Sequence, residues 1–409
     1  MTSADHELLR ILQISFAYPP TVGGVESHVW DVSHRLQQEG HAVRVVAGAG
    51  PANTPGTVEV RRFDELTVAR LLDIRAPLHP DAPPDPVAVG RLSSLLSAEV
   101  DDFGPDVVHI HNPHRFGPEL AHALFEASAV PAVATIHDRV RPSLYPQVLN
   151  LPWEVVLYVS HHISEELPSA RSTAVRWLGI DLDAFGPDGP ADARLQAMPR
   201  PVIFHPARLK RWKGIECGIR AFAEVHRKLG GTLVLCESGD VVGSPKRADQ
   251  FRAELTALAN RLGIAASVRF ASFTYAEIPA AYRAADLVWY PTIDEEALGL
   301  VPLEAMAVGV PVVVSRSGGM RETVRDNENG LTVEKDNSAA LAAAATRLLT
   351  DQRLRDRIVA NGRRHSADFD VGSYAQWLVW QYCSAVNVRR PLMVTQERAP
   401  AMTRLTDIS

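Results

Sequence analysis

Short apolar runs along the chain alternate with longer segments in which apolar residues recur every three or four positions. In the first half, such runs predict buried strands over residues 11–16, 41–48, 107–111, 132–137 and 155–160. Between the first two, the segment VESHVWDVSHRLQQEG (25–40) has the apolar spacing of a helix that ends at Gly40. A strand, a glycine loop, a helix and a second strand make a βαβ unit, which indicates a parallel sheet covered by helices.

The second half of the chain begins the same alternation again. Strands are predicted over 201–209, 232–239, 267–273, 286–292 and 310–316, and helices over 215–230 and 247–263. Residues 184–201 concentrate proline, glycine and aspartate, which is typical of a linker. The pattern predicts an α/β chain with two doubly wound, Rossmann-like domains, residues 1–188 and 189–368, facing each other across a cleft. Ligands of such sheets bind beyond the carboxyl ends of the strands, so we expect the site in the cleft.

The end of the chain follows neither alternating pattern. The segment GSYAQWLVWQYCSAV (372–386) carries large apolar side chains. We expect residues 369–388 to form a helix that packs back on the first domain. We expect residues 389–409 to be a flexible tail.

Composition narrows the class of protein. The 409 residues are 46% hydrophobic and 22% charged, as in globular proteins, and the formal net charge of −6 gives no sign of a nucleic-acid partner. The chain has no run of about eighteen apolar residues, and its first residues lack the basic start and apolar core of a signal peptide. Cys217, Cys236 and Cys383 are odd in number and far apart, which argues against a disulfide framework. These features predict a cytoplasmic protein.

The segment DEEALGLVPLEAM (294–306) has the features of an anion site. Pro302 fits the first turn of a helix, and Gly299 in the preceding loop lets backbone N–H groups come close to a ligand. A helix N-terminus with free amides attracts a phosphate or diphosphate. Glu304 is expected within the first turn and Glu296 in the loop, so both carboxylates can face one cleft. The simpler alternative is that Glu304 complements the helix dipole and Glu296 is a solvated loop charge.

Two further segments have chemistry that suits a diphosphate. The segment HPARLKRWKGIECG (205–218) ends a strand and opens a helix, and it clusters four cations: Arg208, Lys210, Arg211 and Lys213. Cations there can neutralise a leaving diphosphate, although such a cluster alone is more often a solvated loop. In FAYPPTVGGVESHV (16–29), Gly23 and Gly24 lie between the first strand and its helix, which is also an anion-binding geometry. Their spacing is neither a dinucleotide fingerprint nor a Walker loop.

Together these segments closely resemble the retaining glycosyltransferases of the GT-B architecture, in glycosyltransferase family 4 (group 1). The resemblance runs from about residue 11 to residue 386. The matching segments are GGVESHV, ARLKRWKG, EALGLVPLEAMAVGVPVVVS and GGMRETVRDNENGLTV, with GIDLDAF (179–185) at the domain junction and AAYRAADLVWYPT (280–292). Leu298 departs from the family pattern, because an aromatic residue is usual at that position.

The resemblance implies roles in binding the donor. Arg208 and Lys213 would hold the diphosphate, and Glu304 would accept hydrogen bonds from the ribose hydroxyls. Glu296 would bind hydroxyls of the transferred sugar. The remaining implied donor contacts are Gly24 and the amides of Leu298, Gly299, Leu300 and Val301. The implied catalytic set is Glu296, Arg208, Lys213 and His137, since His137 ends a first-domain strand and would lie close to the transferred sugar.

The acceptor is expected to contact the first domain through Gly23, His111, Asn112 and Asp138. The alternative for His137 next to Asp138 is a satisfied structural pair. His109, His111 and His114 lie in a strand-to-loop segment without a set of carboxylates or cysteines, so we expect no metal site and no cofactor.

The resemblance implies that a hexose or amino-hexose is transferred with retention from a nucleoside diphosphate sugar, with UDP favoured as the nucleotide. The expected acceptor is a hydroxyl of a small soluble molecule, such as a sugar, a cyclitol or an aminocyclitol antibiotic precursor. No strong basic helix is present, since residues 25–40 carry Arg35 with Glu26, Asp31 and Glu39, so we expect no membrane association. Two alternatives remain open: a sugar-nucleotide epimerase of similar architecture and a non-catalytic sugar-nucleotide-binding protein.

Overall fold

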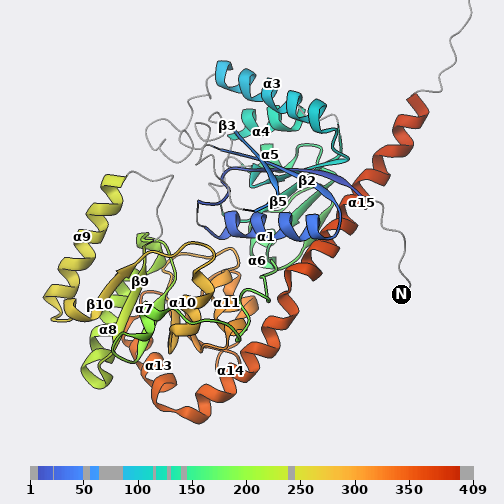
Figure 1. Cartoon of the computed structure of the whole chain (residues 1–409). Coiled ribbons are helices and arrows are strands. Elements are labelled where there is room, and N and C mark those ends of the chain that lie inside the picture. The colour runs from blue at the N-terminus through green and yellow to red at the C-terminus, as the bar shows by residue number, and fades with distance from the viewer. Residues whose placement is uncertain are drawn as a thin grey trace, which may run out of the picture.

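The fold consists of two α/β domains, each built on a parallel sheet (Figure 1). The computed structural model describes residues 8–21, 23–48, 56–63, 86–113, 117–126, 130–139, 145–237 and 245–396. Both predicted doubly wound domains are confirmed. Within the described residues, no helix combines the length and the apolar character needed to cross a membrane.

The first domain has a 7-stranded sheet in the order β3-β2-β1-β4-β5-β6-β7. The direction in which strands are added reverses between β1 and β4, so the loops after these two strands diverge and leave a crevice at the carboxyl edge of the sheet. The strands are β1 (Arg10–Ser15), β2 (Ala42–Gly48), β3 (Glu59–Phe63), β4 (Val107–His111), β5 (Ala132–Ile136), β6 (Val155–Tyr158) and β7 (Thr173–Val175).

The second domain has a 6-stranded sheet in the order β10-β9-β8-β11-β12-β13. Here the reversal falls between β8 and β11; the loops after these strands carry the cation cluster and Glu296, and Glu304 lies in the helix that follows the second loop. The strands are β8 (Val202–His205), β9 (Thr232–Cys236), β10 (Val268–Ala271), β11 (Leu287–Tyr290), β12 (Val312–Ser315) and β13 (Leu331–Val333).

Every strand predicted from an apolar run is present, but three further strands are not among those predictions. These are β3, β7 and β13, and each lies at an edge of its sheet. An edge strand is covered on fewer sides, so it needs a shorter and less apolar run than a central strand. The sequence EVRRF of β3, half exposed and rich in charge, shows why the pattern gave no signal.

The predicted helices over 25–40, 215–230 and 247–263 are present as α1 (Gly24–Gln38), α8 (Ile215–Leu229) and α9 (Pro245–Arg261). The other first-domain helices are α3 (Pro86–Phe103), α4 (Gly117–Glu126), α5 (Tyr145–Leu149) and α6 (His161–Glu166). The remaining helices are α7 (Ala193–Gln196), α10 (Ile278–Ala284), α11 (Leu300–Val308), α12 (Met320–Thr323), α13 (Ser338–Thr350), α14 (Gln352–Ser366) and α15 (Val371–Gln396), with single 3₁₀ turns at Arg211–Lys213, Ala265–Ser267 and Ala367–Phe369.

Each sheet is buried on both faces, which is why its central strands read as continuous apolar runs. In β8, the side chain of Ile203 packs into one apolar cluster, while Val202 and Phe204 pack into the cluster on the opposite face. The same division separates Val313 from Val312 and Val314 in β12.

The long C-terminal helix α15 crosses from the second domain to the first (Figure 1). Its residues Tyr374, Leu378 and Tyr382 are buried in the apolar cluster that also contains Val29 and Leu36 of α1. The helix runs to Gln396, beyond the end expected at residue 388, because each residue added to an existing helix gains a backbone hydrogen bond. The rest of the expected tail, 397–409, lies outside the described residues.

The domains also contact each other directly beside the cleft. The Tyr275 hydroxyl donates a hydrogen bond to Asp31 Oδ1 of α1 over 2.5 Å. Glu322 of α12 accepts hydrogen bonds from the His162 amide of α6 at 2.8 Å and from Trp177 Nε1 at 2.7 Å. These contacts hold the two walls of the cleft together.

Candidate active site

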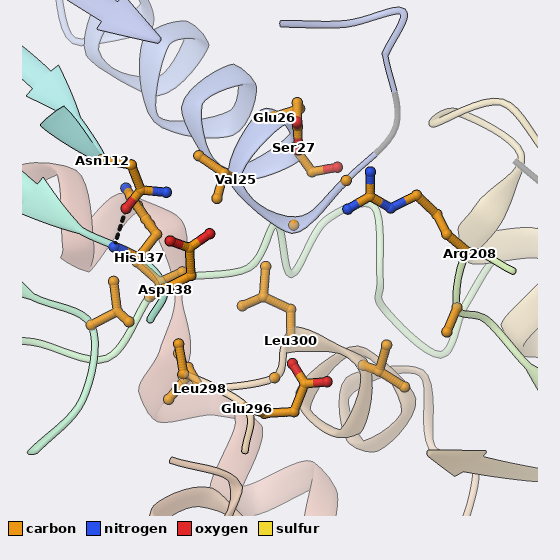
Figure 2. A pocket seen from close by; sticks show the side chains of 18 of the residues that line it. Val25, Glu26, Ser27, Asn112, His137, Asp138, Arg208, Glu296, Leu298 and Leu300 are labelled. Atoms are coloured by element: carbon orange, nitrogen blue, oxygen red, sulfur yellow. Dashed lines mark hydrogen bonds between the residues drawn. The ribbon is translucent and has the colours of Figure 1, made fainter. Parts of the chain in front are cut away.

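A cavity of about 1020 Å³ lies between the two domains. Glu296 and Arg208 reach into it from the second domain and Asp138 from the first (Figure 2). All the residues for which the sequence predicted a role line this cavity: Gly23, Gly24, His111, Asn112, His137, Asp138, Arg208, Lys213, Glu296, Leu298, Gly299, Leu300, Val301 and Glu304.

The loop after β11 presents the N-terminus of α11 to the cavity. Gly299 has φ 82°, and a Cβ at this position would lie 2.7 Å from Met320 Cγ, so only glycine fits there. Helix α11 begins immediately afterwards, at Leu300. The expectation that Glu304 lies in the first turn is therefore wrong: the helix starts before Pro302, and Glu304 lies in the second turn.

Glu296 and Lys213 form an ion pair inside the cavity. Lys213 Nζ lies 2.8 Å from Glu296 Oε1, and the Tyr290 hydroxyl lies 3.0 Å from the same oxygen. Lys213 also donates to the Tyr290 hydroxyl. Burial lowers the pKa of Lys213, and the neighbouring Glu296 carboxylate partly offsets this shift. Lys213 and Glu296 thus compensate each other's charge within the cavity.

Glu304 is held by Tyr282, whose hydroxyl donates a hydrogen bond of 2.5 Å to Glu304 Oε2. Burial raises the pKa of Glu304 to about 7, although the hydrogen bond from Tyr282 opposes the shift. The carboxyl group therefore changes charge near neutral pH.

The basic cluster 208–213 divides between two surroundings. Arg208 and Lys213 line the cavity, as noted above. Arg211 lies outside it, where it pairs with Glu216 at 2.8 Å and with Glu254. Two of the four cations therefore line the cavity.

The first-domain wall includes the loop before α1 and the ends of β4 and β5. At Gly24 an added Cβ would meet nothing within 4 Å, so the backbone there adjoins open space. At Gly23 an added Cβ would lie 2.1 Å from Glu26 Oε2. Asn112 has φ 52°, and its side-chain oxygen accepts a hydrogen bond of 2.6 Å from the His137 amide (Figure 2).

Buried histidines lie behind this wall. His111 is 1% exposed, with Nδ1 2.9 Å from His137 Nε2 and Nε2 3.0 Å from Gln13 Oε1. His109 lies next to it, 2.7 Å from both the Tyr382 hydroxyl and Thr135 Oγ1. Burial holds the pKa of His109 and His111 well below the usual range, so both rings are neutral.

Three residues had no role in the sequence-based prediction: Tyr290 and Trp212, which line the cavity, and Tyr282, which contacts the cavity-lining Glu304. The hydroxyl of Tyr290 and that of Tyr282 contact the two glutamates, and the ring of Trp212 lies 3.8 Å from Lys213 Nζ. Tyr290 could have been found, because it lies near the carboxyl end of the strand predicted over 286–292 and ends the observed strand β11. Tyr282 lies in α10 and reaches Glu304 only through the packing of that helix against α11.

Comparisons with known proteins identify the family of the chain. A family model described as Glycosyltransferase Family 4 matches residues 22–184, and one described as Glycosyl transferases group 1 matches residues 192–365. The chain is 35% identical over 387 residues to a GDP-mannose-dependent alpha-(1-6)-phosphatidylinositol monomannoside mannosyltransferase of Mycolicibacterium smegmatis, covering 88% of this chain and 94% of the relative. The chain belongs to glycosyltransferase family 4.

Other members of glycosyltransferase family 4 and solved structures extend the likeness. The chain is 34% identical over 417 residues to a D-inositol 3-phosphate glycosyltransferase of Salinispora arenicola, covering 90% of this chain and 89% of that relative. Its fold matches a sucrose-phosphate synthase from Thermosynechococcus elongatus with TM-score 0.74 and 21% identity, over 95% of this chain and all of that one. An Anabaena protein in complex with UDP and glucose matches with TM-score 0.72 and 22% identity, over 92% of this chain and all of that one. This family 4 glycosyltransferase therefore has the GT-B fold.

Proposed function

We propose that this glycosyltransferase moves a hexose or amino-hexose, with retention of anomeric configuration, from a nucleoside diphosphate sugar to a hydroxyl group of a small acceptor. One observation carries the proposal: Arg208, Lys213 and the N-terminus of α11 surround the same cavity as Glu296 and Glu304. Cations and helix amides suit a diphosphate, and carboxylates suit the hydroxyl groups of the two sugars that flank it.

In this proposal, the second domain binds the donor. Arg208 and Lys213 hold the diphosphate, Glu304 accepts hydrogen bonds from the ribose, and Glu296 binds hydroxyls of the transferred sugar. Lys213 and Glu296 are paired with each other, so donor binding exchanges their mutual contact for contacts to phosphate and sugar. Val301, Leu300 and Gly299 contribute backbone N–H groups at the start of α11.

Two lines of reasoning bear on the nucleotide and the acceptor. The family resemblance favours UDP, whereas the mycobacterial relative named by its donor uses GDP-mannose. Both relatives described above are named for inositol-containing acceptors, which supports a cyclitol among the acceptor classes expected from the sequence. In our proposal the acceptor lies against the first-domain wall, near Gly23, Asn112 and Asp138.

Retention requires the acceptor to enter on the face that the diphosphate leaves. The bond from the anomeric carbon to the phosphate oxygen breaks as the bond to the acceptor oxygen forms, and the acceptor proton passes to the departing diphosphate oxygen. Glu296 is held by Lys213 and Tyr290, so we assign it to binding and charge stabilisation and not to covalent attack. Catalysis then rests on positioning and on the positive charge of Arg208 and Lys213, which takes the place of a metal ion.

The decisive experiment incubates the purified protein with radiolabelled UDP-glucose, UDP-N-acetylglucosamine and GDP-mannose, with and without myo-inositol or a monosaccharide, in the presence of EDTA. We expect slow hydrolysis of one donor and faster consumption of that donor when an acceptor is added. The new glycosidic linkage should have the same anomeric configuration, axial or equatorial, as the donor. Release of an epimeric sugar nucleotide would indicate the epimerase alternative. Donor binding without any turnover would indicate the binding-protein alternative.

A further inference from the structure

A row of hydrogen-bonded side chains crosses three neighbouring strands of the first sheet and ends at His137. In the sheet, Gln13 of β1 is opposite His109 of β4, and His111 of β4 is opposite Thr135 of β5. Since side chains alternate along strands, Gln13, His111 and His137 all lie on the same face. That face is covered by α1 and α15, which exclude water from the row.

The row is fully buried along most of its length. Gln13 is 0% exposed, His111 1% and His137 5%, and the two histidines line the cavity. Both ring nitrogens of His111 are engaged, with Gln13 on one side and His137 on the other. Because this leaves His111 no ring nitrogen for an acceptor, the expectation that its side chain binds the acceptor does not fit the geometry.

The orientation of the Gln13 amide, with Oε1 toward His111, sets where the protons lie. Gln13 Oε1 is an acceptor, so His111 Nε2 must carry a proton and donate it over 3.0 Å. A neutral His111 then has a lone pair at Nδ1, and the atom 2.9 Å from it, His137 Nε2, must carry the proton. Donors thus run in one direction, from His137 through His111 to Gln13.

We propose that Gln13 and His111 are positioning residues that fix the ring orientation and the tautomer of His137, with its proton on Nε2. The inference rests on the proposed function in one respect, namely that His137 lies near the transferred sugar. The hydrogen bond between His137 Nε2 and the buried His111 keeps the His137 ring from turning when substrates enter and leave. His28 of α1 supports the same ring from another side, with its ring centroid 5.4 Å from that of His137.

Two substitutions distinguish a purely structural role of His111 from a role in positioning His137, because the two roles predict opposite results for them. His111→Leu keeps most of the volume and suits an apolar core, so packing alone would favour it. His111→Asn loses volume but keeps an acceptor oxygen near the position of Nδ1. If His111 acts through His137, the asparagine variant retains most of the turnover, and the leucine variant loses about tenfold, the scale of one hydrogen bond.

The test combines nuclear magnetic resonance of histidine-labelled full-length protein with kinetics. The ¹⁵N shifts of His137, assigned by comparison with His137→Gln, should report a protonated Nε2 in the wild type and in His111→Asn. They should report mixed tautomers in His111→Leu and Gln13→Leu. His226 of α8, which does not line the cavity, provides the control. His226→Asn and His226→Leu should leave both the His137 signals and turnover unchanged.

Two results would overturn the proposal. One is an unprotonated Nε2 at His137 in the wild type, which would mean that the Gln13 amide is reversed and the donors run the other way. The other is a His111→Leu variant that is folded and as active as the wild type. The resonance measurement needs no substrate, so absence of any glycosyl transfer would count against the proposed function and leave the tautomer result standing.

Discussion

Lys213 and Glu296, which lie 83 positions apart in the chain, form an ion pair of 2.8 Å within the cavity between the domains. The side chains are only 12% and 10% exposed, so solvent screens the pair weakly. A ligand that binds both residues must therefore supply a partner for each charge. A nucleoside diphosphate sugar does so, since its phosphates can face the ammonium group and its hydroxyls the carboxylate.

Removing either charge should affect both activity and stability. Lys213→Met or Glu296→Gln is expected to lower kcat by at least about a hundredfold, the scale of one charge-stabilising contact. Lys213→Met also leaves the Glu296 carboxylate without its cation, which should lower the free energy of unfolding by about 3 kcal/mol. The double variant should recover most of this stability but no activity. Denaturant unfolding and donor consumption measure the two effects separately, and near-normal turnover in either single variant would remove the assignment.

Glu304 should make stability depend on pH. Its pKa of about 7 lies above the ordinary value of 4.5, so the folded state keeps a proton that the unfolded state has lost between these two pH values. The contribution of protonated Glu304 to the free energy of unfolding is complete below about pH 4.5 and disappears as the pH rises through 7. At pH 8 the ionised group should therefore cost the ligand-free protein up to about 3 kcal/mol relative to the acidic limit.

The matched variant for this effect is Glu304→Gln, which cannot ionise and keeps the acceptor oxygen for Tyr282. Thermal unfolding at pH 5 and pH 8 should show a larger loss of stability in the wild type than in the variant. Donor affinity should change in the other direction, rising with pH in the wild type only, since the ionised carboxylate is the better acceptor for ribose hydroxyls. Parallel pH profiles for the two proteins would contradict both statements.

Two glycines of the cavity should respond to alanine in opposite ways. Gly24→Ala places its methyl group in open space at the start of α1, so stability should be unchanged or slightly higher while donor turnover falls. Gly299→Ala forces φ 82° on an alanine and brings Cβ to 2.7 Å from Met320 Cγ, so it should lose about 1–3 kcal/mol of stability. Thermal unfolding and initial rates of both variants, measured side by side, separate the two effects. A stable Gly299→Ala protein would show that the loop relaxes.

The hydrogen bond from Tyr275 to Asp31 joins the walls of the cleft, and its loss should favour an open arrangement. Burial raises the pKa of Asp31 to about 8, so at neutral pH this contact links two largely uncharged groups. Tyr275→Phe should therefore raise KM for the donor only about fivefold, as expected for one neutral hydrogen bond. Small-angle scattering should show a larger radius of gyration in the absence of ligand. Tyr158→Phe, which loses a hydrogen bond to Leu167 within the first domain, is the control and should change neither quantity.

Sequence patterns were reliable where a residue's surroundings follow from its neighbours in the chain. Central strands such as β1 and β11 are buried on both faces, so their apolar runs identify them directly. The edge strand β3 gave no such signal because its residues are charged and partly exposed, and β13 gave none because it is only 3 residues long. The start of α11 was misplaced because Pro302 is compatible with several positions in a first turn, and only the left-handed backbone of Gly299 defines where the helix begins.

For the site, the chain alone determined which residues gather at the carboxyl edges of the two sheets. A residue that follows a parallel strand emerges at that edge whatever the rest of the fold does, so Arg208, His137 and Glu296 could be placed in one cleft from their positions after strands. Only the tertiary structure decided which atoms meet inside the cleft. The pairing of Lys213 with Glu296, the contact of Tyr282 with Glu304 and the proton order through His111 depend on side chains brought together from separate loops, helices and strands, and no local pattern encodes such distances.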